Sequence, residues 1–425
     1  MTDYSFSIAT LGCRANQADS DRLRAILSGA GFEEKPFGES VTCSVVNTCT
    51  VTAEADRKSR QLLRRALRVL PEGGQAIATG CAVAQRGGLN KLPGAALRLP
   101  PDRREEILSL LQVEGCPGRE IPSGVSAKTR ALLKIQDGCD QFCTFCIVPY
   151  VRGRSKSVPL AKVVEQAVEF EQNGYQEIVL TGIHLAIWGH DLEGEPTLAT
   201  LAQAILDATR HVQVRISSVE PDRFPLSLID LMAREPRLCP YLHLVLQHPS
   251  DKLLERMHRG YTLATYEEIV TKFFREVPLA TLSSDIMIGF PGEDESDHKL
   301  LKSFLKRTPY HHLHVFPYSI RPGTAASKFK DKVPKDVQKR RRNEVLRLGE
   351  KLKIASLQRM YGETLEVIFE QETRPGWFKG TAINGMSVLG KAGPAVLNRK
   401  VPVTIKRRLG NDLVGDVVGV LSTEI

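Results

Sequence analysis

Three cysteines lie close together in the segment DGCDQFCTFCIVP, with the spacing C-x-x-x-C-x-x-C: Cys139, Cys143 and Cys146. Cysteine thiolates hold iron–sulfur clusters, and three thiolates on a four-iron cubane leave one iron open to an exogenous chelator. A structural zinc site usually has a fourth Cys or His, often in a second spaced pair. No such pair is adjacent here, so the spacing favours an iron–sulfur cluster over zinc.

Three further cysteines stand far apart in the first part of the chain, in the contexts TLGC, NTC and TGC: Cys13, Cys49 and Cys81. Each follows a short apolar run. Strand ends in one parallel sheet would bring these sulfurs to one crevice. Three unrelated buried thiols explain the pattern equally well, so the residues alone leave both interpretations open. The remaining cysteines have no such context and are interpreted as core or surface thiols: Cys43, Cys116 and Cys239.

The composition describes the scaffold that must hold these cysteines. The chain has 425 residues, of which 42% are apolar and 25% charged, typical of a globular protein of about two to four domains. No apolar run approaches the roughly 18 residues of a membrane span, and an export signal is absent from the first residues. We therefore expect a cytoplasmic protein with no membrane partner, and we do not expect structural disulfides among its nine cysteines.

Strands and helices alternate in the first region, residues 1–115. Apolar runs predict strands at residues 6–11, 41–46 and 76–79. Helical spacing follows Asp19, and residues 56–70 form a basic amphipathic pattern. This alternation predicts a small α/β domain with a parallel sheet. The three separated cysteines come just after its predicted strands.

The alternation is regular in the second region, residues 125–357. Strands are predicted at residues 131–136, 177–181, 213–217, 242–246, 284–288 and 312–316. Helices are predicted at residues 160–173, 198–209, 226–234, 266–277 and 296–307. A full eight-fold barrel needs two more units than this, so we predict an open (β/α)6 partial barrel, with its chemistry at the C-terminal strand ends.

The last region begins with a long basic helix from Pro334 to about Met360. Short alternating runs follow at residues 364–369, 401–405 and 413–421, broken by Gly and Pro. This spacing predicts a small closed β-barrel at residues 358–425.

The cysteine loop resembles that of the radical S-adenosylmethionine (SAM) enzymes. With TLGCRANQADS, VVNTCTVT and TGC upstream, the chain resembles the methylthiotransferases over nearly its whole length. The likeness continues through IVLTGIHLAIWGHD, RISSVEP, ERMHRGYT, SSDIMIGFPGE and FPYSIRPGTAA. NTCTVTAEADRKSRQ and VPYVRGRSKS are most similar to the MtaB-type branch, which modifies threonylcarbamoyladenosine next to the tRNA anticodon. The closing region resembles the TRAM-like RNA-binding barrel of this family.

The resemblance implies two [4Fe–4S] clusters. One would be held by Cys139, Cys143 and Cys146, with SAM on its open iron as the source of a deoxyadenosyl radical. An auxiliary cluster that presents sulfur would be held by Cys13, Cys49 and Cys81. A methylthio group would replace hydrogen on C2 of the adenine, chemistry that belongs to cofactors rather than side chains. The implied partners are the tRNA anticodon stem-loop and an electron donor such as flavodoxin or ferredoxin.

Four residues at predicted strand ends are candidates for the SAM pocket: Thr181, Gly182, Glu220 and Gln247. A structural loop role explains each of them as well. The family pattern would have Gln-Ser-Gly-Ser at residues 247–250, whereas this chain has Gln-His-Pro-Ser. Proline fixes φ and lacks an N–H, so a loop that used glycine there must be rebuilt.

Basic residues cluster in three regions of the chain, which favours RNA as a partner, although any one run alone is more typical of a solvated face. The first run is Arg57, Lys58, Arg60, Arg64, Arg65 and Arg68. The second is Lys339, Arg340, Arg341 and Arg342, and the third is Arg399, Lys400, Lys406, Arg407 and Arg408. Trp377 and Phe378 fit either base stacking or a barrel core.

Two other functions remain open at this point. One is a methylthiotransferase of another branch, which acts on isopentenyladenosine in tRNA or on a ribosomal protein aspartate. The other is a non-catalytic RNA-binding protein with a zinc or redox centre. Iron content separates the last from the enzymes, because two cubanes contain about eight irons.

Overall fold

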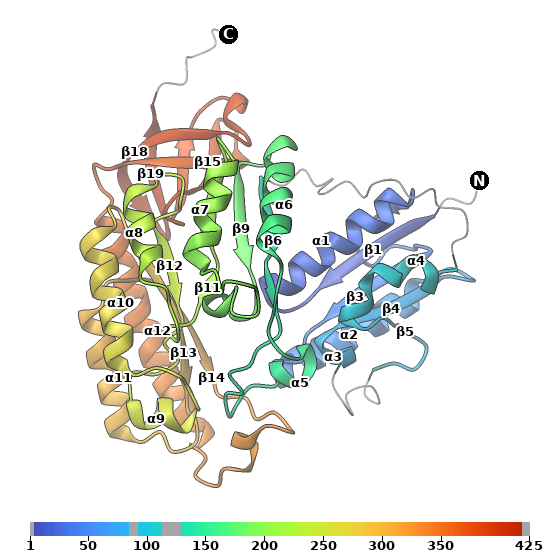
Figure 1. Ribbon diagram of the computed structural model, residues 1–425, viewed down its shortest axis with the longest axis horizontal. Coiled ribbons are helices and arrows are strands. Elements are labelled where there is room, and N and C mark those ends of the chain that lie inside the picture. The colour runs from blue at the N-terminus through green and yellow to red at the C-terminus, as the bar shows by residue number, and fades with distance from the viewer. Residues whose placement is uncertain (1–3, 85–91, 113–128, 419–425) are drawn as a thin grey trace.

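The computed structural model describes residues 4–84, 92–112 and 129–418. An N-terminal α/β layer, blue in Figure 1, lies beside a central array of strands and helices, and a C-terminal ring of strands lies at one end of that array. The predicted α/β fold class is confirmed. The predicted junction at residues 115–125 lies outside the described residues. In the described ranges, no helix is long and apolar enough to cross a membrane.

The N-terminal sheet has the strand order β2-β1-β3-β4-β5 and is parallel throughout. Its strands are β1 (Ser5–Thr10), β2 (Glu33–Glu34), β3 (Cys43–Thr48), β4 (Gln75–Gly80) and β5 (Leu97–Arg98). Helices α1 (Arg14–Gly29), α2 (Ala53–Val69), α3 (Cys81–Ala84) and α4 (Ile107–Leu110) accompany it. The residues of β3 are all buried, as expected for a central parallel strand. Helix α1 begins earlier than predicted, directly after Cys13.

The central array contains the six predicted parallel strands, each within a few residues of its expected place: β6 (Arg130–Lys134), β9 (Glu177–Thr181), β10 (Gln213–Ile216), β12 (Tyr241–Leu244), β13 (Thr281–Ile288) and β14 (Tyr310–Pro317). Between β10 and β12 the array is interrupted at Ser217. One sheet is β10-β9-β6, and the other is β11-β12-β13-β14, where β11 (Ser218–Val219) continues the line of β10. No pairing joins β6 to β14 among the described residues, so the barrel is open.

Five helices cover the outside of these strands: α6 (Leu160–Gln172), α7 (Leu198–Ala208), α8 (Ser227–Arg234), α10 (Leu263–Glu276) and α11 (Glu295–Arg307). Alternate strand residues such as Ile178, Val214 and Leu242 pack against them in the main core. The residues between these point inward and include many polar side chains. Arg215 and Glu177, for example, form a buried ion pair of two hydrogen bonds, 2.9 and 2.8 Å long.

Short elements that the sequence patterns did not predict surround the cysteine loop. They are the antiparallel pair β7 (Gln136–Asp137) and β8 (Lys156–Ser157), together with helices α5 (Val148–Arg152) and α9 (Asp251–Arg256). Short 3₁₀ segments occupy Pro101–Glu106, Leu185–Ile187, Ala325–Lys328 and Pro394–Val396.

The long helix α12 (Lys335–Gln358) leads into the C-terminal ring and begins after Pro334, as predicted. The ring is a closed barrel, β15-β16-β17-β19-β18. Its strands are β15 (Thr364–Arg374), β16 (Trp377–Ala382), β17 (Ser387–Lys391), β18 (Lys400–Leu409) and β19 (Asp412–Val417). Strands β16 and β17 were not predicted, because glycines interrupt their alternation of apolar and polar residues. Phe378 is fully buried in the barrel core, so it cannot stack on RNA bases.

Candidate active site

The loop after β7 carries Cys139, Cys143 and Cys146, at the C-terminal end of the barrel strands. Burial, together with the neighbouring thiols of Cys143 and Cys139, raises the pKa of Cys146 to about 12. Burial and the Cys143 thiol also raise the pKa of Cys139. The three sulfurs are thus near enough to repel one another as thiolates. A metal centre that replaces the protons would relieve this repulsion.

Each sulfur of this triad accepts a hydrogen bond. The backbone N–H groups of Gln141 and Val148 donate to Cys139 and Cys146, both at 3.4 Å between N and S. Arg259 Nη1 donates to Cys143 Sγ at 3.1 Å. Donors directed at sulfur favour its anionic form and tune an iron–sulfur cluster.

The loop itself is held from two sides, because Thr144 N–H donates to Met257 O at 3.0 Å and Thr144 O accepts from Ala326 N–H at 2.8 Å. Phe142 has a φ of 46°, a left-handed conformation that is uncommon away from glycine. A backbone fixed in this way presents the cysteines in one arrangement.

The N-terminal sheet brings Cys13, Cys49 and Cys81 to one edge. They follow β1, β3 and β4, which are three adjacent parallel strands. Burial raises the pKa of Cys49 to about 11, and the thiols of Cys81 and Cys13 also raise it. A Cβ on Gly12, whose φ is +99°, would lie 3.0 Å from Cys49 Sγ. The expected convergence of three sulfurs is therefore present in the fold.

Neither triad is packed tightly enough for a single ion. Throughout the described ranges, no three His, Cys, Asp or Glu side chains form a group that could hold one metal ion. A zinc site needs all of its ligands within bonding distance of one atom. In a cubane each cysteine binds a different iron, so the sulfurs stand further apart. Each triad supplies three sulfur donors that do not meet at one atom, which fits a cluster better than zinc.

Helix α5 connects the two triads. It begins two residues after Cys146, and α3, which starts at Cys81, packs against it. Ile147 and Val151 contact Cys81 in a small apolar cluster, and Arg152 Nε donates to Cys81 Sγ at 3.3 Å. The two cysteine sets therefore adjoin one interface between the N-terminal sheet and the barrel.

Arg152 is a fully buried cation in this interface. Its guanidinium pairs with Asp19 at 3.1 Å and with Asp137 at 2.8 Å, and it hydrogen-bonds Asn16. Arg152 and Lys134 hold the pKa of the Asp137 carboxyl well below its usual range, despite its burial. A buried charge is tolerated only when paired and hydrogen-bonded, so Asp19 fixes α5 against α1 and Asp137 fixes it against β7.

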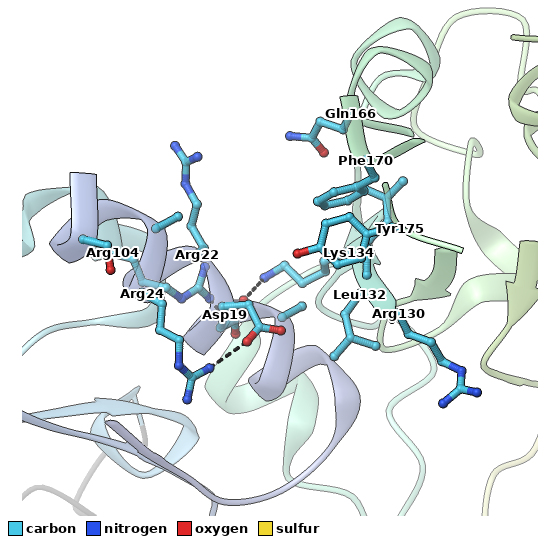
Figure 2. Close-up of a pocket in the computed structure, with 16 residues that line it drawn as sticks. Asp19, Arg22, Arg24, Arg104, Arg130, Leu132, Lys134, Gln166, Phe170 and Tyr175 are labelled. Carbon is cyan, nitrogen blue, oxygen red and sulfur yellow. Dashed lines mark hydrogen bonds and ion pairs between the residues drawn. The ribbon is translucent and has the colours of Figure 1, made fainter. Parts of the chain in front are cut away.

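Figure 2 shows the neighbouring part of the interface, where α1 faces β6 and α6. Lys134 reaches across to Asp19 at 2.5 Å. A cavity of about 210 Å³ opens beside this pair, with arginines of α1 on one side and Phe170 and Tyr175 on the other. Its described lining includes none of the six triad cysteines, so it is separate from the candidate active site.

The four SAM-pocket candidates all lie at C-terminal strand ends. Thr181 is buried, and its carbonyl accepts from Ile135 N–H at 2.9 Å. A Cβ on Gly182 would lie 3.1 Å from Gln136 O. Gln136 also binds the next two backbone N–H groups through its side-chain oxygen, at 2.9 and 3.0 Å. The position of Gly182 thus has a structural reason of its own.

Glu220 and Gln247 differ in their surroundings. Glu220 forms an ion pair with Arg259, the residue that donates to Cys143, so it joins the rim of the barrel triad. Gln247 has a φ of 60° and is buried, and its Oε1 has no partner among the described residues. In this loop Gln247 itself is the residue with a left-handed backbone conformation. His248, the next residue, accepts from Ser250 N–H through Nδ1 at 3.0 Å.

Sequence reasoning gave no role to three buried arginines of the site. They are Arg152, Arg259 and Arg321, each inside a quoted motif. Arg321 donates to Thr50, next to Cys49, and to Asp56, both at 2.7 Å. A single arginine in a loop gives no periodic signal, and its partners are distant in sequence. The motifs themselves were the only available clue.

The three basic runs differ in how far their side chains are exposed. On α2, the side chains of Arg64, Arg65 and Arg68 are exposed. On α12, Arg341 is buried and pairs with Glu293 at 2.8 Å, so it is not available to RNA. In the C-terminal barrel Arg407 is exposed. In the α12 run Lys339 and Arg340 are exposed, although Arg340 pairs with Glu295 and Glu344, so all three runs keep exposed cations.

Comparisons with known proteins agree with this geometry. Residues 133–304 match the Radical SAM superfamily, and residues 5–95 match Uncharacterized protein family UPF0004. The chain is 32% identical over 418 residues to the threonylcarbamoyladenosine tRNA methylthiotransferase MtaB of Bacillus subtilis, covering 93% of this chain and 92% of that protein. It is 35% identical over 382 residues to MtaB of Aquifex aeolicus, covering 86% and 92%.

The fold is similar to that of TsrM, a radical SAM methyltransferase from Kitasatospora setae. The TM-score is 0.54 at 14% identity, with 94% of this chain and 83% of that chain covered. The resemblance stated from the motifs is thereby confirmed. Membership of the radical SAM superfamily implies SAM and a [4Fe–4S] cluster. The chain belongs to the radical SAM methylthiotransferase family and is an enzyme of that class.

Proposed function

We propose that this enzyme adds a methylthio group to C2 of N6-threonylcarbamoyladenosine, next to the anticodon of tRNA. The main structural support is that both cysteine triads adjoin the interface that α5 and Arg152 form. The identity to two MtaB proteins over most of the chain supports the choice of substrate.

In this proposal the two triads have separate tasks. Cys139, Cys143 and Cys146 hold the cluster that binds SAM, and Cys13, Cys49 and Cys81 hold a second [4Fe–4S] cluster. When bound, SAM and the clusters supply the radical and sulfur chemistry that side-chain acids and bases cannot provide. The chain's own residues position these groups. Arg152 and Arg259 direct N–H donors at one sulfur of each triad.

Thr181, Gly182, Glu220 and Gln247 complete the SAM pocket in this proposal. The unpartnered Oε1 of Gln247 is the strongest support, because a buried amide oxygen without a donor is costly until a ligand supplies one. Glu220 contributes by holding Arg259 beside Cys143.

We assign residues 1–115 to the auxiliary-cluster domain, 125–357 to the radical SAM core and 358–425 to a TRAM-like tRNA-binding domain. Arg407 and Trp377 on the C-terminal barrel, with the exposed arginines of α2, contact RNA. A small electron-transfer protein such as flavodoxin or ferredoxin supplies electrons, and the enzyme acts in the cytoplasm, where its thiols stay reduced.

The test uses anaerobically reconstituted enzyme and anticodon stem-loop RNAs that carry either threonylcarbamoyladenosine or isopentenyladenosine. Mass spectrometry of the nucleosides should detect a methylthio group in place of hydrogen on the first RNA only. Modification of the second RNA instead would assign the enzyme to the isopentenyladenosine branch. Modification of neither, with one zinc and no iron in the protein, would favour the non-catalytic alternative.

A further inference from the structure

A second cavity, of about 350 Å³, follows the inward face of the open barrel. Its walls come from β6, β9, β10, β12, β13 and β14. Three further residues extend it beyond these strands: Arg14, the residue directly after Cys13, and Thr381 and Gly385 of the C-terminal barrel. The strand residues of the cavity lie mostly at the N-terminal ends of their strands, beside the C-terminal barrel that we assign to tRNA binding, and Arg14 extends it toward the N-terminal sheet that carries the auxiliary triad.

Its lining is cationic, with three arginines and one glutamate. Arg215 is only 4% exposed, and its Nη1 has no hydrogen-bond partner in the described structure. Glu177 occupies the other two nitrogens of Arg215 and also pairs with Arg130 at 2.8 Å. The exposed Arg14 forms no ion pair with any described residue. The cavity thus contains guanidinium N–H groups whose hydrogen-bonding capacity the chain leaves unused.

Unused guanidinium donors in a partly buried cavity favour an anion such as a carboxylate, because charge-assisted hydrogen bonds are strong. Arg14 can offer a whole guanidinium fork, and Arg215 can add its Nη1. The volume lies near the lower end of small-ligand sites. It suits one amino-acid-sized group and is too small for a stretch of RNA. The buried His311 Nδ1 and Ser283 Oγ are also unpartnered in the described structure and offer neutral contacts to such a group.

The substrate of the proposed function carries such a group. The threonylcarbamoyl arm on N6 ends in a carboxylate and a hydroxyl, whereas an isopentenyl arm is apolar and uncharged. We propose that this cavity receives the threonylcarbamoyl arm and that Arg14 and Arg215 bind its carboxylate. This inference rests on the proposed function and names the part of the chain that selects among modified adenosines.

The position of Arg14 next to Cys13 means that its contact with the carboxylate would also affect how the adenine is oriented. Arg14 is the first residue of α1, and Cys13 precedes it as the N-cap residue. A carboxylate bound to Arg14 is therefore anchored next to the auxiliary triad. Binding of the arm would orient the adenine as well as identify it, so Arg14 is a specificity and positioning residue.

The test measures binding of the full chain to four anticodon stem-loop RNAs by fluorescence anisotropy. The base next to the anticodon is threonylcarbamoyladenosine, its methyl ester, isopentenyladenosine or adenosine. We expect wild type to bind the first RNA about tenfold more tightly than the other three, the effect of a hydrogen bond to a charged group. The methyl ester lacks the negative charge of the carboxylate but has nearly the same size, so it shows whether charge or size determines the preference.

Arg14→Gln should remove the tenfold preference and leave binding to the other three RNAs unchanged. Arg215→Gln alone would leave Glu177 buried and unpaired, so the second variant is the double substitution Arg215→Gln with Glu177→Gln, which should also lose the preference. Arg407→Gln, on the exposed face of the C-terminal barrel, is the matched control. It should weaken all four RNAs by the same factor, because phosphate contacts do not depend on the base.

An undiminished preference in both cavity variants would overturn the inference. So would an equal loss for all four RNAs in Arg14→Gln, which would make Arg14 a phosphate contact. Failure of the proposed function looks different: wild type itself would then bind or modify the isopentenyladenosine RNA in preference to the threonylcarbamoyladenosine RNA.

Discussion

The two cysteine triads reach similar arrangements by different routes. Cys139, Cys143 and Cys146 sit on one loop, fixed by backbone hydrogen bonds within it and to neighbouring loops. Cys13, Cys49 and Cys81 come from three strand ends, so only the order β1-β3-β4 brings them together. The first triad is formed by one short segment, which the neighbouring loops of the barrel hold in place. The second is a product of tertiary structure, and it depends on every contact that holds the sheet in register.

In other respects the triads are alike. Each has one sulfur that accepts from a buried arginine, Arg152 at Cys81 and Arg259 at Cys143. Each arginine is in turn paired with carboxylates, Asp19 and Asp137 in one case and Glu220 in the other. Both triads, one at strand ends and one on a loop, thus have a buried arginine that is paired with carboxylate and donates to a cysteine sulfur.

The largest expected effect separates the tasks of the triads. Cys143→Ala should abolish reductive cleavage of SAM, because its cluster would lose one of three protein ligands, while the absorbance of the auxiliary cluster remains. Cys49→Ala should keep SAM cleavage and abolish methylthio transfer. Deoxyadenosine and the modified nucleoside, quantified by mass spectrometry, report the two activities. Equal loss of both activities in both variants would contradict the assignment of separate tasks.

The second prediction tests how closely the sheet packs behind the auxiliary triad. Gly12→Ala would place a Cβ 3.0 Å from Cys49 Sγ at a backbone φ of +99°, which displaces the sulfur. Iron bound after reconstitution should fall from about eight to about four atoms per chain. Gly31→Ala is the matched control, since φ there is +88° and nothing lies within 4 Å of the added carbon. It should keep all of the iron, at a cost in stability of roughly 1 kcal/mol.

These cases show how far the sequence predicted the molecule. The placement of three cysteines after apolar runs was enough to predict that they follow adjacent strands of one sheet, and the six barrel strands were found within a few residues. That each set of three cysteines holds a cluster stays a prediction. The partners of Arg152 were not predictable, because Asp19 lies 133 positions away in the chain and one buried cation has no periodicity. The left-handed backbone conformation of Gln247 could not be predicted either. A residue other than glycine adopts a positive φ only where the surrounding structure imposes it.

The third prediction concerns the bridge between the triads. Arg152→Ala would leave Asp19 paired with Lys134 and Arg104 only, so we expect a loss of at most about 3 kcal/mol, the lower end of the cost of breaking a buried pair. Urea denaturation of the protein should report a decrease of this size in the free energy of unfolding. Arg154→Ala removes the exposed pair with Asp140, whose arginine side chain is 74% exposed. That control should change stability by less than about 1 kcal/mol, and a similar decrease in both variants would show that Arg152 does not support the interface.

The smallest expected effect is a pH dependence from buried histidines on the barrel side. Burial lowers the pKa of His248 to about 3 and of His184 and His311 to about 4. In the unfolded chain a histidine takes up its proton near pH 6.5. The unfolded state therefore binds more protons between about pH 6.5 and 4, and the free energy of unfolding must fall as the pH is lowered through this window. Above pH 6.5 the contribution is complete.

Cluster-free protein is suited to this measurement, because the pKa values of Cys49 and Cys146, about 11 and 12, keep those thiols neutral throughout the window. His248→Asn keeps an acceptor for Ser250 N–H but cannot titrate. It should reduce the slope of stability against pH by at most about 1.4 kcal/mol per pH unit. His258→Asn, at an exposed position, controls for the effect of the substitution itself. If stability instead rose on acidification, His248 would have to bind its proton more strongly in the folded protein, and the loop at residues 247–250 would not be packed as described.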